Sequence, residues 1–305
     1  MNKTAQIILN LIVGLVSFLF FALLMFPLDS MIGHFLSKLE DSTKGEWKVS
    51  VSDIDASLLF DTEFKDFRLF QRGKEIFHAP RIEAGVSLLP LISGNVNLRF
   101  TANYNKGEIS GRVTLAEDSV VDLNLEKVNL KELTILTDFL KSGNYPQLSS
   151  GELNGTVYFS WSRDLRTRDG EVNLKIKNAK MGSLSLKALN MEIPAMELSQ
   201  GSKAIELEGS FDRGQITFTK FNIPGPDLIF DVSGNLRLNR NNEIIRINIG
   251  GKFGFSDKVK QQVSFVSMLD GQESADGSFP LSLQGSAKKP SIKIGDIDLG
   301  QFLKF

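Results

Sequence analysis

The side chains best suited to acid–base, nucleophilic or metal chemistry are scarce in this sequence. The 305 residues contain two histidines, His34 and His78, and no cysteine. Without cysteine there is no thiolate nucleophile, disulfide framework or cysteine-ligated zinc site. A two-histidine metal site would need both histidines, which lie on different segments, and a Ser-His-Asp triad would need one of them. We therefore interpret both as ordinary surface or boundary residues.

Pairs of carboxylates spaced two residues apart are the next candidates. Asp53 and Asp55 form one pair, and Asp296 and Asp298 form another. This spacing places both members on one face of a strand, where paired carboxylates can act as general acid and base. Solvated strand faces routinely carry the same pattern, and no Walker-type phosphate loop, HExxH, EF-hand or GxSxG motif accompanies it. We expect a protein that is not an enzyme and that has no cofactor and no metal site.

The charge balance argues against a nucleic-acid partner. The chain carries 35 basic and 36 acidic residues, for a net charge of −1. Lys and Arg are interspersed with Asp and Glu nearly everywhere, whereas a protein that binds the phosphate backbone needs a basic surface excess. The apolar share of 42% is sufficient to build a core.

The N-terminal segment has the length and composition of a membrane anchor. Residues 7–26 are uncharged and apolar, and about 20 such residues cross a bilayer as a helix. The run is longer than a signal-peptide core and lacks a small-x-small cleavage site, so we expect it to remain uncleaved. Lys3 precedes the run and Asp29 follows it, so the positive-inside rule places the N-terminus in the cytoplasm. The anchor residues are Ile7, Leu11, Leu15, Phe18, Leu19, Phe21, Leu24 and Phe26.

A second, amphipathic helix is predicted at residues 28–42. Its apolar residues recur at helical spacing, and Pro27 suits the first turn of a new helix. The helix can either lie in the membrane interface or cap one end of the domain that follows. Its polar face is not strongly basic, which favours the cap. The apolar face comprises Leu28, Met31, Ile32, Phe35, Leu36 and Leu39.

From residue 46 onward the hydrophobic period changes to two. Such alternation predicts strands with one buried and one solvated face. Gly and Asn separate the runs, and short, regular intervals between strands are typical of an antiparallel meander. The predicted strands include 47–51, 62–71 with a slip before Phe67, 96–100, 109–115, 121–125, 157–159, 172–176, 205–207, 216–218, 229–238, 245–249 and 281–283.

Two stretches interrupt the strand pattern. Residues 130–140 have helical spacing, and residues 258–269 suit a second short helix, although part of that stretch would equally suit a strand. Residues 141–150 contain Gly143 and Pro146 and form a possible seam. We predict three parts: a cytoplasmic tip with the transmembrane signal anchor (1–27), the amphipathic helix (28–42) and a periplasmic β body (43–305).

A meander with one continuous apolar face must bury that face. It can close into a barrel, stack a second sheet in a sandwich, or stay open as a groove covered by a helix or a ligand. The chain has 23 Phe against 3 Tyr and 2 Trp, so its large rings mostly lack a polar group. These rings suit a packed core, and they equally suit an apolar groove for acyl chains. The sequence does not choose among these arrangements.

A family resemblance is carried by the order of segments along nearly the whole chain. Those segments are Phe26-Pro27 after the anchor, the amphipathic helix, Val49–Ile54, the hairpin 56–71, Arg81–Gly94, Phe279–Gly285 and Lys289–Ile294. Together they resemble the type II secretion system protein N family in its long form. The pattern of a strand, Ser-Leu-Leu-Pro-Leu-Ile and another strand also resembles the AsmA-like and TamB-like proteins. Those are periplasmic β-groove proteins anchored in the bacterial inner membrane and linked to lipid movement toward the outer membrane.

The resemblance implies two alternative functions. The first is a non-enzymatic accessory component of a type II secretion system, anchored in the inner membrane and contacting other envelope or secretion proteins. The second is an AsmA-like protein that binds or conducts phospholipid along an apolar groove, which an open trough would favour over a packed sandwich. A third hypothesis is an outer-membrane barrel, suggested by the terminal Phe305 and disfavoured by the anchor and the scarcity of Tyr and Trp. The resemblance transfers no catalytic residue.

Overall fold

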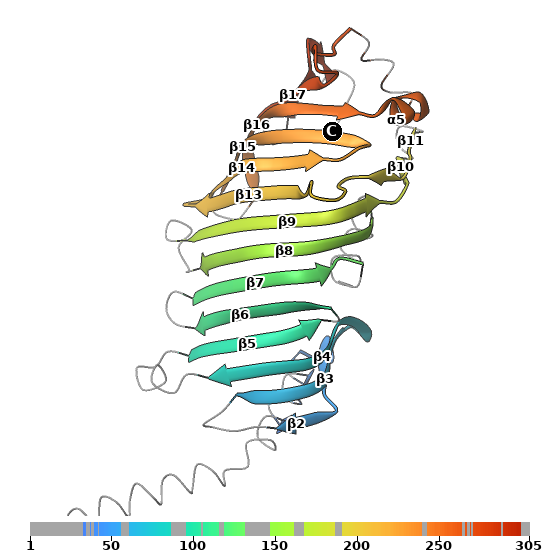
Figure 1. Ribbon diagram of the computed structural model, residues 1–305. Helices are drawn as coiled ribbons and strands as arrows, with labels where there is room; N and C mark the ends of the chain where they lie inside the picture. The colour runs from blue at the N-terminus through green and yellow to red at the C-terminus, as the bar shows by residue number, and fades with distance from the viewer. Residues whose placement is uncertain are drawn as a thin grey trace, which may run out of the picture.

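The described chain is built almost wholly of strands that pair with their neighbours in sequence (Figure 1). Seventeen strands form one antiparallel sheet, and the hairpin of β10 and β11 pairs apart from it. The mainly-β meander predicted from the period-two pattern is therefore confirmed. The computed structural model describes residues 33–34, 37, 40–41, 43–55, 61–86, 96–104, 106–115, 119–131, 147–161, 168–186, 191–239, 243–263, 266, 269, 271–287 and 289–299.

The first half of the sheet starts from an interrupted edge strand. Strands β1 and β2 pair with opposite ends of β3, and each strand from β3 to β9 then pairs with the next. The bounds are β1 Trp47–Ser50, β2 Asp53–Asp55, β3 Thr62–Gln71, β4 Lys74–Val86, β5 Val96–Tyr104, β6 Gly107–Leu115, β7 Ser119–Asn129, β8 Leu148–Trp161 and β9 Asp169–Met181. The pairing of β7 with β8 carries the sheet past the possible seam, of which residues 141–146 lie outside the described residues.

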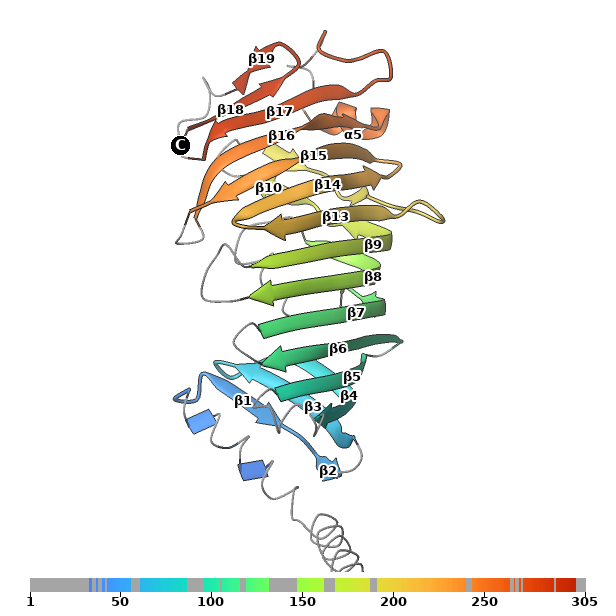
Figure 2. The ribbon, with the colours of Figure 1, turned by 90° about the vertical axis from the view of Figure 1, so that its left-hand side faces the viewer.

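The second half continues from β9, because β12 and β13 both pair with it. Each strand from β13 to β19 pairs with the next. The bounds are β10 Leu184–Leu186, β11 Met191–Ile193, β12 Met196–Glu197, β13 Ile205–Asp212, β14 Gln215–Pro224, β15 Leu228–Leu238, β16 Ile244–Phe255, β17 Phe279–Ser286, β18 Lys289–Ile294 and β19 Ile297–Asp298. Strands β1 and β2 lie at one end of the stack and β19 at the other, so the sheet is long and open (Figure 2).

Helices are short in the described chain. Helix α5 spans Asp257–Gln262, with Ser256 as its N-cap, and overlaps the first part of the predicted range 258–269. Residues 33–34, 37 and 40–41 are helical, but the predicted apolar face of that helix lies outside the described residues. The predicted anchor and residues 132–140 also lie outside them. None of the helices in the described part of the chain combines the length and the apolar character needed to cross a membrane.

Residues with positive φ keep the apolar side chains in register where the strands slip. Lys127 (φ 52°) lies in the bulge between Leu125 and Val128, and its N–H donates to Asn154 Oδ1 (2.9 Å). Asn178 (φ 52°) lies in β9 where the register with β8 shifts between Ser150 and Glu152. Asp66 also has positive φ (50°), and the Phe64 and Phe67 rings on either side of it lie 6.3 Å apart, but the register of β3 with β4 shifts between Leu69 and Phe70. Because one extra residue would otherwise turn every following side chain to the opposite face, these bulges preserve a single apolar face.

Glycines allow neighbouring strands to approach where a side chain would collide. At Gly234 (φ 149°), an added Cβ would lie 2.1 Å from the Asn248 carbonyl oxygen of the paired strand. Gly155 (φ 147°) has the same relation to the Asn173 carbonyl oxygen, at 2.0 Å. L-residues rarely adopt this backbone conformation, so glycine is required at both positions.

We predict that Gly234→Ala lowers the free energy of unfolding by about 1–3 kcal/mol, the cost typical of a strained backbone position. Gly250→Ala in the paired strand is the matched control, because nothing lies within 4 Å of its added Cβ. Urea titration followed by circular dichroism measures both variants. Equal effects of the two substitutions would contradict the proposed requirement at Gly234.

Candidate functional site

The residues singled out for chemistry do not converge in the described structure. His34 is exposed in a helical turn, and His78 lies at the solvent boundary of β4. His78 Nε2 is 2.7 Å from Asp66 Oδ1. This hydrogen bond, together with that from Arg68, lowers the pKa of the Asp66 carboxyl. No group of three His, Asp or Glu side chains suited to a metal ion occurs among the described residues.

The two carboxylate pairs have different outcomes. Asp53 and Asp55 face Lys65 and Glu63 of β3, so both lie on one face of β2 as predicted. The Lys65 ammonium lies 2.9 Å from Asp53 and lowers the pKa of that carboxyl. The prediction for the second pair was wrong, because Asp296 lies in the turn before β19 and does not share a strand with its partner.

The dominant feature of the molecule is an apolar face that runs across the whole sheet. The register places Leu174 of β9 opposite Gly155 of β8 and Leu207 of β13, and the same face continues in both directions. Opposed residues share a face in antiparallel pairs, so the apolar positions of successive strands form continuous rows. The rows include Phe64, Ile82, Phe100, Ile109, Leu123, Val157, Val172, Phe211, Phe218, Val232, Ile249, Leu283 and Ile292.

Aromatic rings line this face at intervals. Phe77 stacks on Tyr104 with ring centroids 5.5 Å apart, and Phe159 lies 5.8 Å from Phe211 across β9. Other contacts on the same face join Phe221 with Phe230 and Phe253 with Phe279, at 5.4 and 5.3 Å. Such ring pairs stabilise the packing by about 0.5–1.5 kcal/mol beyond the area they bury.

The opposite face of the sheet is polar and charged. Glu206 of β13 lies between Lys175 of β9 and Lys220 of β14 and forms salt bridges with both. The hydrogen bond from Lys220 is the main cause of the lowered Glu206 pKa, and Lys175 adds to it. Along β9 the burial alternates without exception from Asp169 to Lys177, with the apolar positions the less exposed. One face is thus built for water and the other for an apolar environment.

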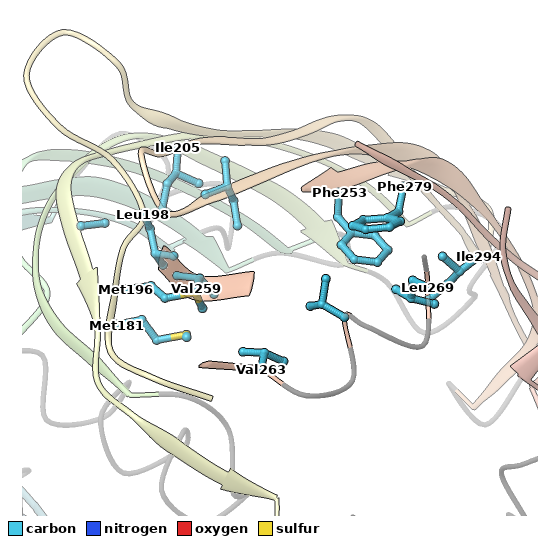
Figure 3. Close-up of a cluster of buried hydrophobic side chains, with 13 residues drawn as sticks. Met181, Met196, Leu198, Ile205, Phe253, Val259, Val263, Leu269, Phe279 and Ile294 are labelled. Atoms are coloured by element: carbon cyan, nitrogen blue, oxygen red, sulfur yellow. The ribbon is translucent and has the colours of Figure 1, made fainter. Parts of the chain in front are cut away.

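A chain segment covers one side of the apolar face. Helix α5 and the residues after it place Val259 and Leu269 beneath the arched sheet, each 1% exposed (Figure 3). Helix α5 contacts β16. The buried cluster comprises Ala179, Met181, Met196, Leu198, Ile205, Ile223, Phe253, Val259, Val263, Val266, Leu269, Phe279 and Ile294. We call the strand ends that carry this cluster the covered side.

The other ends of the same strands form the open side. We call the apolar face between the two sides, which lies on the inside of the arched sheet (Figure 3), the trough. Phe211, Ile216, Leu236 and Ile247 are opposed across β13 to β16 on the apolar face. All four are only partly buried, and none belongs to a buried cluster. A continuous row of partly exposed apolar side chains is a candidate binding region. The candidate functional site is therefore the trough.

The alternation of apolar and polar residues in the sequence identified strands. It did not show that the apolar residues of successive strands line one common face. The buried segment 196–199 was not anticipated. Ser199 Oγ accepts a hydrogen bond from the Ala179 N–H (2.9 Å) and donates one to the Ile176 carbonyl (3.1 Å). Two backbone groups at the bulge in β9 thereby gain hydrogen-bond partners. A short Met-Glu-Leu alternation was its only sequence signal.

Comparison with known proteins gave no match to a family model, a curated protein or a solved structure.

We predict that shortening a side chain in the buried cluster lowers the free energy of unfolding much more than shortening a partly exposed side chain of the apolar face. Leu269→Ala should lower the free energy of unfolding by about 2–5 kcal/mol, as expected for a fully buried leucine. Leu207→Ala on the partly exposed face should cost about 1 kcal/mol, because less of its side chain is removed from water. Chemical denaturation measures both. Equal large losses would contradict an open trough.

We also predict that Asp276 makes the covering segment sensitive to acid. Its carboxylate binds Lys252 Nζ (2.6 Å) and accepts from Ser278, and these hydrogen bonds hold its pKa well below the usual range. A lowered pKa in the folded state stabilises the fold above the usual carboxyl pKa, and this stabilisation is lost as the pH falls through the folded value. The difference in melting temperature between the wild type and Asp276→Asn should therefore shrink as the pH falls from about 5 to about 2. A constant difference would contradict this role.

Proposed function

We propose that the trough binds lipid acyl chains and that the protein is a non-enzymatic, AsmA-like component of a bacterial envelope. The observation that carries the proposal is a long, uncharged apolar face that stays open on one side of the described sheet. An acyl chain needs apolar contact without directional hydrogen bonds, and rows of Leu, Ile, Val and Phe provide it.

The dimensions of the trough suit lipid. The strands from β3 to β18 lie side by side at about 4.8 Å spacing, which gives a length of roughly 55–60 Å. One leaflet of a bilayer has an acyl layer about 15 Å thick. The trough is therefore several acyl layers long, which favours movement of lipid along it as well as storage.

Placement in the envelope rests on the sequence. The apolar run 7–26 supports a single-pass anchor in the inner membrane, with the N-terminus in the cytoplasm and the β body in the periplasm. In this arrangement the strands of the trough begin next to the membrane that holds the anchor.

The second candidate function is an accessory role in a type II secretion system. It is supported by the resemblance of segments along the chain, two of which form β17 and β18. In that role the apolar face would receive another secretion or envelope protein in place of lipid. A β groove can also serve both roles, with lipid bound as a structural component.

We predict that a photoreactive p-benzoylphenylalanine at the position of Phe159 captures lipid in living cells. Phe159 lies on the apolar face, whereas the adjacent Tyr158 lies on the polar face and is the matched control. Mass spectrometry of the purified full-length protein should show lipid adducts at position 159 and none at 158. A protein adduct of defined mass at position 159, without lipid, would favour the secretion role and contradict lipid binding.

A further inference from the structure

Two arginines face each other on the polar side of β15 and β16. Arg237 and Arg246 are directly opposed in the register, and both are exposed. Like charges placed opposite each other destabilise a strand pair unless something compensates them. Neither arginine forms a salt bridge with a described residue, and the neighbouring Asp212 is paired with Arg213 (3.1 Å). The pair therefore carries an uncompensated charge of two.

A second arginine pair in this sheet lies close to carboxylates. Arg99 and Arg112 are opposed in β5 and β6 in the same way. Arg99 lies 3.8 Å from Asp61, and Arg112 faces Asp122 of β7. Among the described residues, the pair in β15 and β16 has no salt bridge of the kind that Arg99 forms with Asp61.

The arginine pair lies in a polar hollow near the open side of the trough. The hollow has a volume of about 500 Å³, and none of the described residues that line it is acidic. Lys289 of β18 continues the cross-strand row through Ser286, which adds a third cation. Amide and hydroxyl groups complete the lining, which comprises Gln215, Asn235, Arg237, Arg246, Ile247, Asn248, Gln284, Gly285 and Ser291. Guanidinium groups beside amide donors are suited to phosphate oxygens.

Apolar side chains are exposed beside this hollow. Ile244 and Ile245, at the start of β16, are 43% and 44% exposed. Ile244 opposes Leu238 on the apolar face, whereas Arg246 opposes Arg237 on the polar face. At this end of β15 and β16, apolar and basic side chains therefore lie on opposite faces of the sheet. Trp161, the last residue of β8, pairs with Ser119 at the start of β7 and is 50% exposed. Exposed apolar residues next to basic ones are typical of surfaces that enter the headgroup region of an anionic membrane.

We propose that the rim formed by Ile244, Ile245, Arg237, Arg246 and Lys289 docks on an anionic phospholipid surface. The arginine pair binds lipid phosphate, while the isoleucines enter the boundary between headgroups and acyl chains. The open side of the trough is thereby held against the acyl layer. This docking extends the proposed function but does not depend on whether the trough contains lipid.

The test uses the full-length protein in neutral phosphatidylcholine nanodiscs and measures its co-sedimentation with separate vesicles. We expect binding to vesicles with about 30% phosphatidylglycerol and little binding to pure phosphatidylcholine. R237Q/R246Q should weaken the binding at least tenfold, because each basic residue near an anionic surface contributes about fivefold. R99Q/R112Q removes the same charge elsewhere and should bind like the wild type. I244S/I245S keeps the charge and should also weaken the binding.

Three results would overturn the proposal. Equal losses in the two arginine double variants would show a nonspecific charge effect. Equal binding to neutral and anionic vesicles would exclude recognition of the headgroup charge. Binding of inorganic phosphate without any binding of vesicles would identify a site for a soluble phosphate compound.

The lipid adduct at position 159 is measured in R237Q/R246Q as well. If vesicle binding is lost and the adduct is retained, the defect is specific to the rim, as proposed. If both are lost while R99Q/R112Q retains both, the rim and the trough are not separate, and docking independent of the trough is overturned. Absence of the adduct in the wild type contradicts only the lipid-binding trough, because vesicle docking is read out independently.

Discussion

Antiparallel register is the constraint on which the rest of this molecule depends. Each strand pairs with the next so that apolar residues oppose apolar residues, as in the row through Leu174 and Leu207. A slip of one residue in any strand would turn its apolar set into water. The chain absorbs register shifts locally, at Lys127 and Asn178, where the backbone adopts positive φ. The result is one apolar surface that spans the sheet, a property that no individual strand has.

The curvature of the sheet and the segment that covers one side of it then determine how much of that apolar surface is accessible. Glycines such as Gly234 let adjacent strands approach more closely than any side chain would allow. The segment around Val259 and Leu269 closes one side of the trough with a conventional buried core. That core supplies stability, so the open side is free of the need to pack on itself. A sheet that buried both sides would be a more stable protein without an accessible apolar surface.

The two proposals concern opposite faces of the same strands and use different interactions. The trough relies on apolar contact, which is nondirectional and suits acyl chains of varied length. The rim relies on two guanidinium groups that form no salt bridge with the described residues and that suit a fixed phosphate charge. At the end of β16 the two faces meet within a few residues, where Ile244 and Arg246 lie on opposite sides. This places headgroup and acyl-chain recognition at one edge of the sheet.

The sequence by itself indicated most of the strands and their alternation, because a period of two is a local property of the backbone, although β4 was not among the predicted strands. It also excluded thiol chemistry, since the chain has no cysteine. Only the tertiary structure decided that the sheet stays open, that α5 covers one side, and that Arg237 faces Arg246. Those features depend on which distant segments pair and how tightly the sheet bends. Alternation is the same in a barrel, a sandwich and a trough, so the pattern alone does not distinguish them.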